Sequence, residues 1–199
     1  MEGKVLINEI SKKDNEELNL KLNIKPNSSL IYNRFIDHNN SNNIITINQN
    51  NSSNVTFNYS MIAHDECKLT INSNIAGNDN NTEIKVKSIT EDKGKCIITS
   101  TANPKSKIVN CNLIESIKKL ILNNEESVCI PNLLVASNEI EVNHACTMSN
   151  INDDYLFYLN SKGISNEKAI NIIKKGYLLS NLDINEEITK NIEKIIGGE

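Results

Sequence analysis

Apolar residues alternate with polar ones in short runs along most of the chain. In the first clear run, Leu18, Leu20, Leu22 and Ile24 are separated by single polar residues. A period of two is typical of β-strands that bury one face. The pattern recurs and predicts further strands around Ile45/Ile47, Val55/Phe57/Tyr59, Leu69/Ile71, Ile84/Val86, Ile97/Ile98, Ile108/Val109 and Ile140/Val142.

Polar, asparagine-rich clusters separate these runs and are expected to form turns, because asparagine tolerates left-handed backbone. They cover residues 39–43, 50–54, 72–74 and 77–82. Residues 115–122 suit either one helical turn or an edge strand. A region of many short strands fits a sandwich, a barrel or a solenoid. The lack of a clean sequence repeat leaves that choice open.

The period becomes helical after residue 150. An N-cap and an acidic first turn at residues 152–154 begin one helix, which Gly163 ends. Ser165 caps a second helix that ends before Gly176, and Asp183 opens a third. The pattern predicts a strand-rich core at residues 1–150 and a C-terminal helical segment at residues 151–199. Such short helices must pack their remaining apolar faces on the strands or on a partner.

Composition excludes several classes of protein. The net charge is −4, from 21 Lys+Arg and 25 Asp+Glu, which argues against nucleic-acid binding. The sequence has no apolar run long enough for a transmembrane helix and no secretion signal at its N-terminus. Its five cysteines form no C-x-x-C pair and are odd in number. We therefore expect reduced thiols and a cytoplasmic protein that does not bind membranes.

The most specific pattern lies between residues 131 and 178. It comprises Pro131–Val135, Glu141–Ser149, Asp154–Ser165 and Gly176–Leu178. This order and spacing closely resemble the C-terminal signature of the SufB/SufD family of iron–sulfur cluster assembly proteins. In that signature a strand leads into a His-x-Ala-Thr-like segment, a short helix follows, and a second helix ends in Gly-Phe or Gly-Tyr.

The resemblance implies a fold and a set of partners. The expected fold is a mainly β, right-handed parallel β-helix (solenoid) followed by the small helical segment. The chain would be a scaffold subunit of a SUF-type complex that pairs with a SufB-like chain or with itself. Its helical segment would dock a SufC-like ABC ATPase. The chain has no G-x-x-x-x-G-K-[ST] phosphate loop, so we expect a non-catalytic scaffold with ATPase activity in the partner.

The resemblance also implies candidate site residues. His144 falls at the signature histidine and is the candidate metal and cluster ligand, because imidazole ligates iron near neutral pH. Cys146 lies two residues later, on the same face of a strand. Cys111 is a weaker alternative sulfur site. The cluster would be transient, at a subunit interface, with none bound permanently.

Alternative interpretations of these residues stay open. His144 suits a structural histidine with backbone hydrogen bonds, and Cys146 suits a small buried residue. Cys129 is expected in the core, as are Cys67 and Cys96. The two other histidines, at positions 38 and 64, are interpreted as surface or turn residues.

Three departures from the family pattern are visible. The family has a helical region before the β-helix, but few residues precede the first predicted strand at Leu18, so that region is expected to be missing or supplied by another chain. The cysteine of SufB-type members aligns with Ser116, and the acid after their histidine is Ala145. Both differences make the chain more similar to SufD than to SufB.

The helices carry the second functional prediction, a docking surface for the ATPase, with packing on the β-helix as the alternative. Two other functions also stay open: a cluster- or metal-holding SufB-like protein that uses His144 with a cysteine, and a degenerate β-solenoid interaction module. The predicted partner-binding residues are Tyr155, Leu156, Phe157, Tyr158, Leu159, Ile170, Ile173 and Tyr177.

Overall fold

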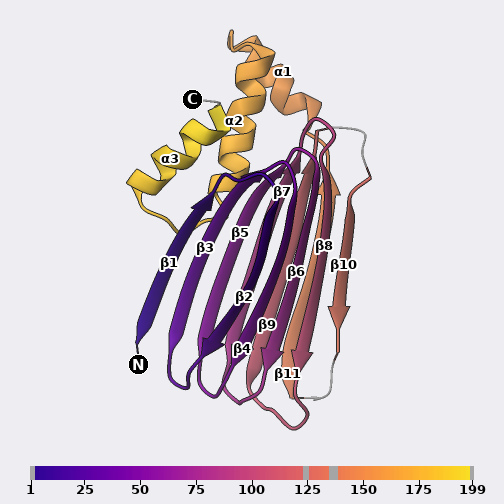
Figure 1. Cartoon of the computed structure of the whole chain (residues 1–199). Helices are drawn as coiled ribbons and strands as arrows, with labels where there is room; N and C mark the ends of the chain where they lie inside the picture. The colour runs from indigo at the N-terminus through magenta and orange to yellow at the C-terminus, as the bar shows by residue number, and fades with distance from the viewer. Residues whose placement is uncertain (1–2, 123–125, 135–138, 198–199) are drawn as a thin grey trace.

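The computed structural model describes residues 3–122, 126–134 and 139–197, in which eleven strands precede three helices (Figure 1). The strands are β1 (Lys4–Ser11), β2 (Glu16–Ile24), β3 (Ser29–His38), β4 (Ser41–Gln49), β5 (Asn54–Ala63), β6 (Glu66–Ile75), β7 (Asn81–Thr90), β8 (Lys95–Pro104), β9 (Cys111–Ile121), β10 (Val128–Leu133) and β11 (Ile140–Ser149). The helices are α1 (Asp153–Ser161), α2 (Asn166–Leu179) and α3 (Glu186–Gly197). None of these helices is long and apolar enough to cross a membrane.

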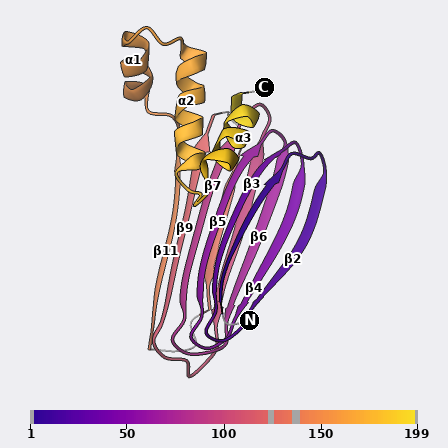
Figure 2. The same ribbon diagram turned by 90° about the vertical axis from the view of Figure 1, so that its left-hand side faces the viewer.

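The strands form two parallel sheets that face each other. The large sheet has the order β1-β3-β5-β7-β9-β11, and the small sheet has the order β10-β8-β6-β4-β2. Each strand lies in the other sheet from the strand before it, so the chain winds into a solenoid of about five turns (Figures 1 and 2). The prediction of a parallel β-helix is confirmed, and the sandwich and barrel alternatives are wrong.

The length of one turn changes along the solenoid. Asn8, Asn33 and Asn58 lie on successive turns at spacings of 25 residues, whereas Asp79 and Asn110 are 31 residues apart. This drift explains why the sequence shows no clean repeat. The stacked asparagine side chains hydrogen-bond from turn to turn, with Asn33 Nδ2 donating to Asn8 Oδ1 at 2.9 Å and Asn58 Nδ2 to Asn33 Oδ1 at 2.8 Å. Asparagines in this chain therefore form hydrogen-bonded ladders on the faces of strands, in addition to their place in turns.

The core lies between the two sheets. Alternate residues of each strand point inward, and the buried ones are mostly isoleucine, leucine, valine and aromatic residues. Tyr32 and Phe57 stack with ring centroids 5.3 Å apart, and Tyr59 stacks on Phe57 at 6.1 Å. Burial of this continuous apolar stripe is the main force that holds the turns together.

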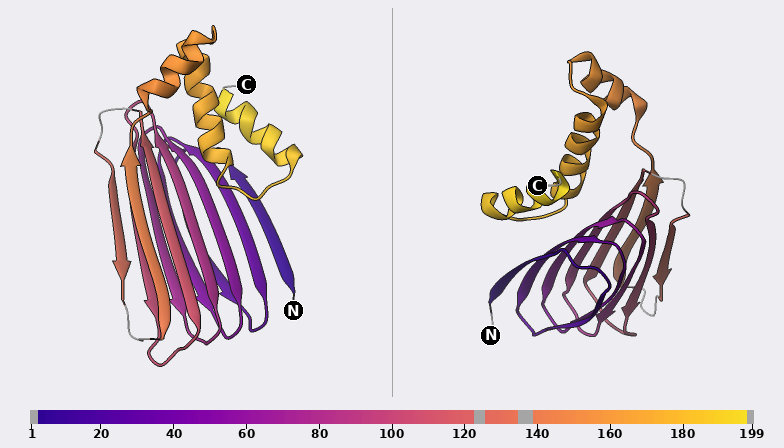
Figure 3. Two further views of the ribbon diagram at one scale, coloured as in Figure 1. Left: turned by 180° about the vertical axis from the view of Figure 1, so that it is seen from behind. Right: turned by 45° about the horizontal axis from the view of Figure 1, so that its top comes forward.

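A second apolar cluster attaches the helices to the outer face of the large sheet. Phe35, Ile62, Ile89 and Leu120 lie near the C-terminal ends of four neighbouring strands of that sheet, and they pack with helical residues that include Leu178, Ile192 and Ile196. The helices therefore gather along the side of the solenoid where the large-sheet strands finish (Figure 3). Helix α1 has no buried residue.

Two strand predictions need correction. The first strand begins at Lys4 rather than near Leu18; the sequence pattern missed it because Ile7 and Ile10 alternate less regularly than the later runs. Ile108 and Val109 lie outside the strands, between β8 and β9. Of the two alternatives for residues 115–122, the strand is confirmed: residues 115–121 belong to β9, which lies inside the large sheet rather than at its edge.

Two helix ends also differ from the sequence prediction. Helix α2 continues through Gly176 to Leu179, because its last turn is packed on the sheet. The third helix starts later than Asp183. The side chain of Asn185 accepts a hydrogen bond from the amide of Ile188 at 2.9 Å, and it is this residue that caps the helix.

Candidate functional site

The last turn of the solenoid places His144 on the inner face of β11. Its register partner on β9 is Glu115, whose side chain is only 2% exposed. Nδ1 of His144 lies 2.9 Å from Oε2 of Glu115, but the two are not aligned as a hydrogen bond. Among the described residues, the two imidazole nitrogens of His144 and Oε2 of Glu115 have no hydrogen-bond partner. Ser100 donates to the other carboxyl oxygen.

Burial shifts the pKa values of both groups toward their neutral forms. It raises the pKa of Glu115 to about 7 and lowers the pKa of His144. A neutral imidazole keeps a lone pair available to a metal at neutral pH. The pair therefore presents an acceptor nitrogen and a protonatable carboxyl at the end of the core.

Two thiols and a lysine lie on the same inner surface. Cys146 follows His144 by two residues on β11, and Cys129 lies on β10 of the facing sheet. Both cysteines are half-buried and pack on the core. Lys119 is 1% exposed, and its Nζ donates to the carbonyl oxygens of Cys96 at 2.7 Å and Val128 at 2.5 Å.

The structure does not bring Cys111 into this group. Cys111 lies four residues before Glu115 on the same strand face, which at about 3.3 Å per residue is roughly 13 Å away. Its thiol donates to the carbonyl oxygen of Gly77 at 3.3 Å. Ser116, which aligns with the cysteine of SufB-type members, points to the outer face of the large sheet instead.

The remaining cysteines and histidines occupy mixed environments. Cys67 and Cys96 are fully buried in the core, as expected. His38 is also buried, with Nε2 3.1 Å from Ser11 Oγ, so its interpretation as a surface or turn residue is wrong. Alternation predicts this burial, because His38 lies on the inward face of β3. His64 lies in the turn after β5, as expected.

The predicted docking residues divide into two groups. On α1, Tyr155, Phe157 and Tyr158 are 65%, 75% and 60% exposed, whereas Leu156 and Leu159 are half-buried. On α2, Ile173 and Tyr177 pack against the cluster that attaches the helices to the solenoid, and Ile170 is half-buried. The exposed aromatic surface is therefore confined to α1.

Sequence reasoning missed Glu115 and Lys119. Both occupy inward positions of β9, in a row with Cys111, Leu113 and Ile117. A charged residue at a core position of an alternating strand is the signal that identifies such a group.

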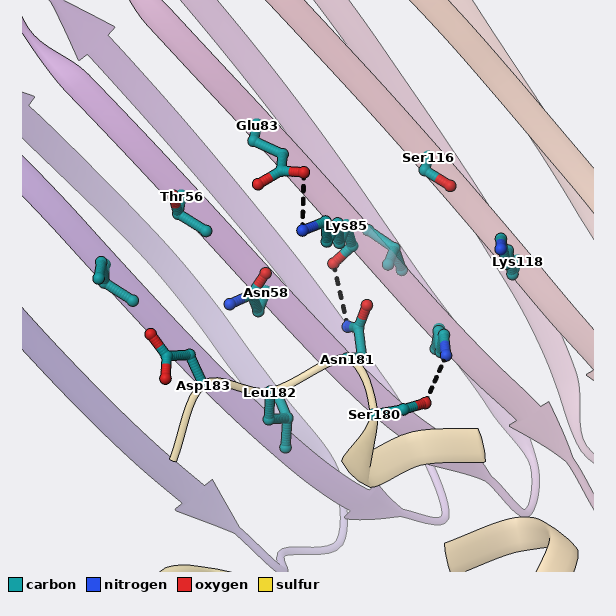
Figure 4. Close-up of a pocket in the computed structure, with 13 residues that line it drawn as sticks. Thr56, Asn58, Glu83, Lys85, Ser116, Lys118, Ser180, Asn181, Leu182 and Asp183 are labelled. Carbon is teal, nitrogen blue, oxygen red and sulfur yellow. Dashed lines mark hydrogen bonds and ion pairs between the residues drawn. The ribbon is translucent and has the colours of Figure 1, made fainter. Parts of the chain in front are cut away.

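A separate groove of about 590 Å³ lies on the outer face of the large sheet, beside the α2–α3 connection (Figure 4). Its floor is lined by Glu83, Lys85, Ser116 and Lys118, and its rim by residues 180–183. Lys85 forms an ion pair with Glu83 at 2.7 Å. The groove lies on the opposite face of the large sheet from His144.

Comparison with known proteins identifies the family. The model for the SufBD core domain of SUF-system FeS cluster assembly proteins matches residues 22–177. An iron–sulfur cluster assembly SufBD family protein of Pyrococcus horikoshii is 40% identical over 67 residues, which are 33% of this chain and 15% of that protein. Another SufBD family protein, of Staphylococcus saprophyticus, is 33% identical over 93 residues, covering 46% and 20% of the two chains.

A third relative is the iron–sulfur cluster assembly protein SufD of Plasmodium falciparum. It is 30% identical over 108 residues, which are 53% of this chain and 7% of that protein. The matches thus span a fifth or less of each of these relatives. The family match covers most of this chain, its parallel β-solenoid and its signature histidine: the chain belongs to the SufBD family of iron–sulfur cluster assembly proteins.

Proposed function

We propose that this chain is a scaffold subunit on which an iron–sulfur cluster forms transiently where two chains meet. The observation that carries the proposal is the His144 imidazole on the inner face of the last turn, whose Nδ1 lies 2.9 Å from the Glu115 carboxyl and whose Nε2 has no hydrogen-bond partner among the described residues. An unpaired buried polar group costs stability, so its retention favours a functional role. The cluster is cargo that is built here and passed on.

The donor set supports assembly at an interface. Within the described ranges, no three His, Cys, Asp or Glu side chains are arranged to hold a metal ion by themselves. A cluster ligated by His144 therefore needs donors from another chain. Strands β10 and β11 each form one edge of their sheet, and edge strands offer unpaired backbone groups to a partner. The partner is a SufB-like chain or a second copy.

Helix α1 is the proposed docking site for a SufC-like ABC ATPase. Tyr155, Phe157 and Tyr158 expose large aromatic surfaces, and aromatic residues carry much of the energy at protein interfaces. The chain lacks a phosphate loop, so nucleotide hydrolysis belongs to that partner. Within the described residues all five cysteines are free thiols, which suits the reducing cytoplasm.

Co-purification tests the docking surface. The chain is co-expressed with the SufC-like ATPase, and the complex is isolated through a tag on the ATPase. The double variant Tyr155→Ala/Phe157→Ala should lose about 2 kcal/mol or more of binding free energy. Leu6→Ala is the matched control, since it removes an exposed apolar side chain from β1 and should bind normally. Equal recovery of all three proteins would refute docking through α1.

Anaerobic reconstitution tests His144. The chain and its SufB-like partner are incubated with iron and sulfide, and the visible absorbance of the cluster is followed. His144→Ala should reduce the yield of cluster, whereas His64→Gln should leave it unchanged because His64 lies in a turn away from β11. Cluster formation that is equal in both variants would remove His144 from the site.

A further inference from the structure

Two lysines face each other in the groove of about 590 Å³ on the outer face of the large sheet. Lys87 on β7 is directly opposite Lys118 on β9, and neighbouring strands lie about 4.8 Å apart. Among the described residues, neither of these lysines forms an ion pair with a carboxylate. Like charges directly opposite each other destabilise a sheet, and an anion bound between them removes that repulsion.

The end of α2 holds Lys87 in place. Its Nζ donates to Ser180 Oγ at 2.7 Å and lies 4.9 Å from the centre of the Tyr177 ring (Figure 4). Burial and then the charge of Lys118 lower the pKa of Lys87, whereas an anion favours the charged form. Ser116, two residues before Lys118 on the same face of β9, adds a hydroxyl donor to the groove.

The groove also contains a buried acceptor without a donor. Asn58 on β5 is 3% exposed and lines the groove, and its Oδ1 has no hydrogen-bond partner among the described residues. The asparagine ladder orients this amide, because Nδ2 of Asn58 donates to Asn33. The next residue in register is Lys85, which is engaged by Glu83 at 2.7 Å (Figure 4). A buried acceptor left unpaired is costly, and it favours a ligand that donates an O–H or N–H group there.

The lysine pair and the free acceptor are spaced for one small molecule. Relative to Asn58, Lys87 lies one strand across and two residues along the sheet, and Lys118 lies one strand further, so the Cα separations are about 8–12 Å. The backbone of Asp183 is hydrogen-bonded to Asn33 on β3, three strands from Lys118, which keeps this carboxylate away from the lysine pair. A groove of about 590 Å³ is within the usual range for small-molecule sites.

We propose that this groove binds a small sugar phosphate, with the phosphate between Lys87 and Lys118 and a sugar hydroxyl donating to Oδ1 of Asn58. The two ammonium groups and the hydroxyl of Ser116 donate to the phosphate oxygens, and hydrogen bonds between charged groups are the stronger class. Binding is reversible and includes no covalent step. The groove and His144 lie on opposite faces of the large sheet, so this site is separate from the proposed cluster site.

Calorimetric titration of the full chain with ribose 5-phosphate, inorganic phosphate and ribose tests the proposal. Ribose 5-phosphate should bind at one site per chain. Inorganic phosphate should bind at least about 10-fold more weakly because it does not reach Asn58, and ribose alone should show no binding. Lys118→Glu should weaken the binding of ribose 5-phosphate by at least about 100-fold. Lys21→Glu makes the same charge change on β2 of the small sheet and should bind normally.

Thermal melts separate loss of binding from loss of folding. Lys118→Glu should fold, because it replaces a like-charge pair by an opposite-charge pair. Ribose 5-phosphate should raise the melting temperature of the wild type and of Lys21→Glu, but not that of Lys118→Glu. The proposal is wrong if millimolar ribose 5-phosphate does not bind, if Lys118→Glu binds it normally, or if inorganic phosphate binds equally well. The test uses this chain alone, so its result is independent of whether the ATPase and the second scaffold chain bind.

Discussion

His64 links three successive turns of the solenoid through two carboxylates. Its Nε2 lies 2.7 Å from Oδ1 of Asp37, and its Nδ1 lies 3.0 Å from Oδ2 of Asp92. The hydrogen bond to Asp37 and then that to Asp92 raise the pKa of His64 to about 9, against the opposing effect of burial. The protonated ring therefore bridges the end of β3, the β5–β6 turn and the β7–β8 turn.

The shift sets an upper limit on the stability that His64 contributes. A rise from the ordinary 6.5 to about 9 corresponds to about 3.4 kcal/mol at 1.36 kcal/mol per pH unit. The side chain is 27% exposed and that of Asp92 is 74% exposed, so water screens the bridge. We therefore expect about 1–2 kcal/mol. Since folding raises this pKa, the contribution is complete below pH 6.5 and is lost as the pH rises to 9.

The assay compares the wild-type chain with His64→Gln in urea at pH 6 and pH 9.5. The chain has no tryptophan, so unfolding is followed by far-ultraviolet circular dichroism. The variant should be about 1–2 kcal/mol less stable at pH 6, and the difference should almost vanish at pH 9.5. Other titrating groups cancel because both proteins contain them.

Other ion pairs near the bridge are present in both proteins and therefore cancel in the comparison. Lys12 lies 3.8 Å from Asp37, and Glu91 is paired with Lys174 at 2.5 Å. Asp37 is nearly buried and Asp92 is exposed, so Asp37→Asn should cost more stability than Asp92→Asn. A difference between wild type and His64→Gln that is the same at both pH values would refute the bridge.

Four further substitutions test side-chain packing, backbone space and surface charge. Leu178→Ala should destabilise the protein by about 3 kcal/mol, because Leu178 is fully buried where α2 meets the large sheet, and hydrogen exchange should rise first in α2 and α3. Gly94→Ala should prevent folding or lower the free energy of unfolding by more than about 3 kcal/mol, since its Cβ would lie 1.9 Å from the last carbonyl oxygen of β5. In Gly176→Ala the new Cβ meets nothing within 4 Å, so this variant should be about 0.5–1 kcal/mol more stable than the wild type. Thermal melts compare the two variants. Lys118→Glu should raise the free energy of unfolding by about 0.5 kcal/mol at low salt, because Lys118 lies directly opposite the like charge of Lys87 on β7. The gain should be much smaller in 1 M NaCl, because salt screens these charges.

Alternation in the sequence predicted many of the strands but missed β1, β3 and β10, and it did not predict how the strands stack. Leu18, Leu20 and Leu22 show an inward face directly, and β2 lies where they predict. The solenoid itself was implied only by the family resemblance. The sequence pattern did not reveal it, because turns that lengthen from 25 to 31 residues conceal the repeat. Asparagines such as Asn33 repeat at the turn spacing, and this signal would have revealed the ladder.

The candidate site was only partly predictable. His144 and Cys146 were identified from the family signature, and the structure places both on one inner face. Their neighbours Glu115, Lys119 and Cys129 come from two other strands, and only the register of the solenoid brings them close. Sequence spacing carries no information on such contacts until the turn lengths are known.

The two ends of the solenoid core hold different buried charged groups. Near the first turn, Arg34 is held by two carboxylates, with Nη2 2.6 Å from Glu16 and Nη1 paired with Glu9, which also accepts from Tyr32. Such a paired network fixes geometry because each charge has its partner. At the last turn, by contrast, His144 is without a hydrogen-bond partner among the described residues, and one oxygen of Glu115 shares that state.

The grouping of donors at the last turn supports the proposed cluster site there. A fold selected only for stability would pair or remove these groups, since replacing a buried unpaired polar residue with an apolar one is commonly stabilising. The unpaired groups persist beside two thiols, at the edge strands where another chain has access. Buried polar atoms without a hydrogen-bond partner also occur at the first turn, such as Nε of Arg34 and Nδ1 of His38, so the proposed site at the last turn rests on the histidine, carboxyl and thiols that face one inner surface there. Replacing Arg34 should impair folding, whereas replacing His144 should impair cluster formation in a chain that folds normally.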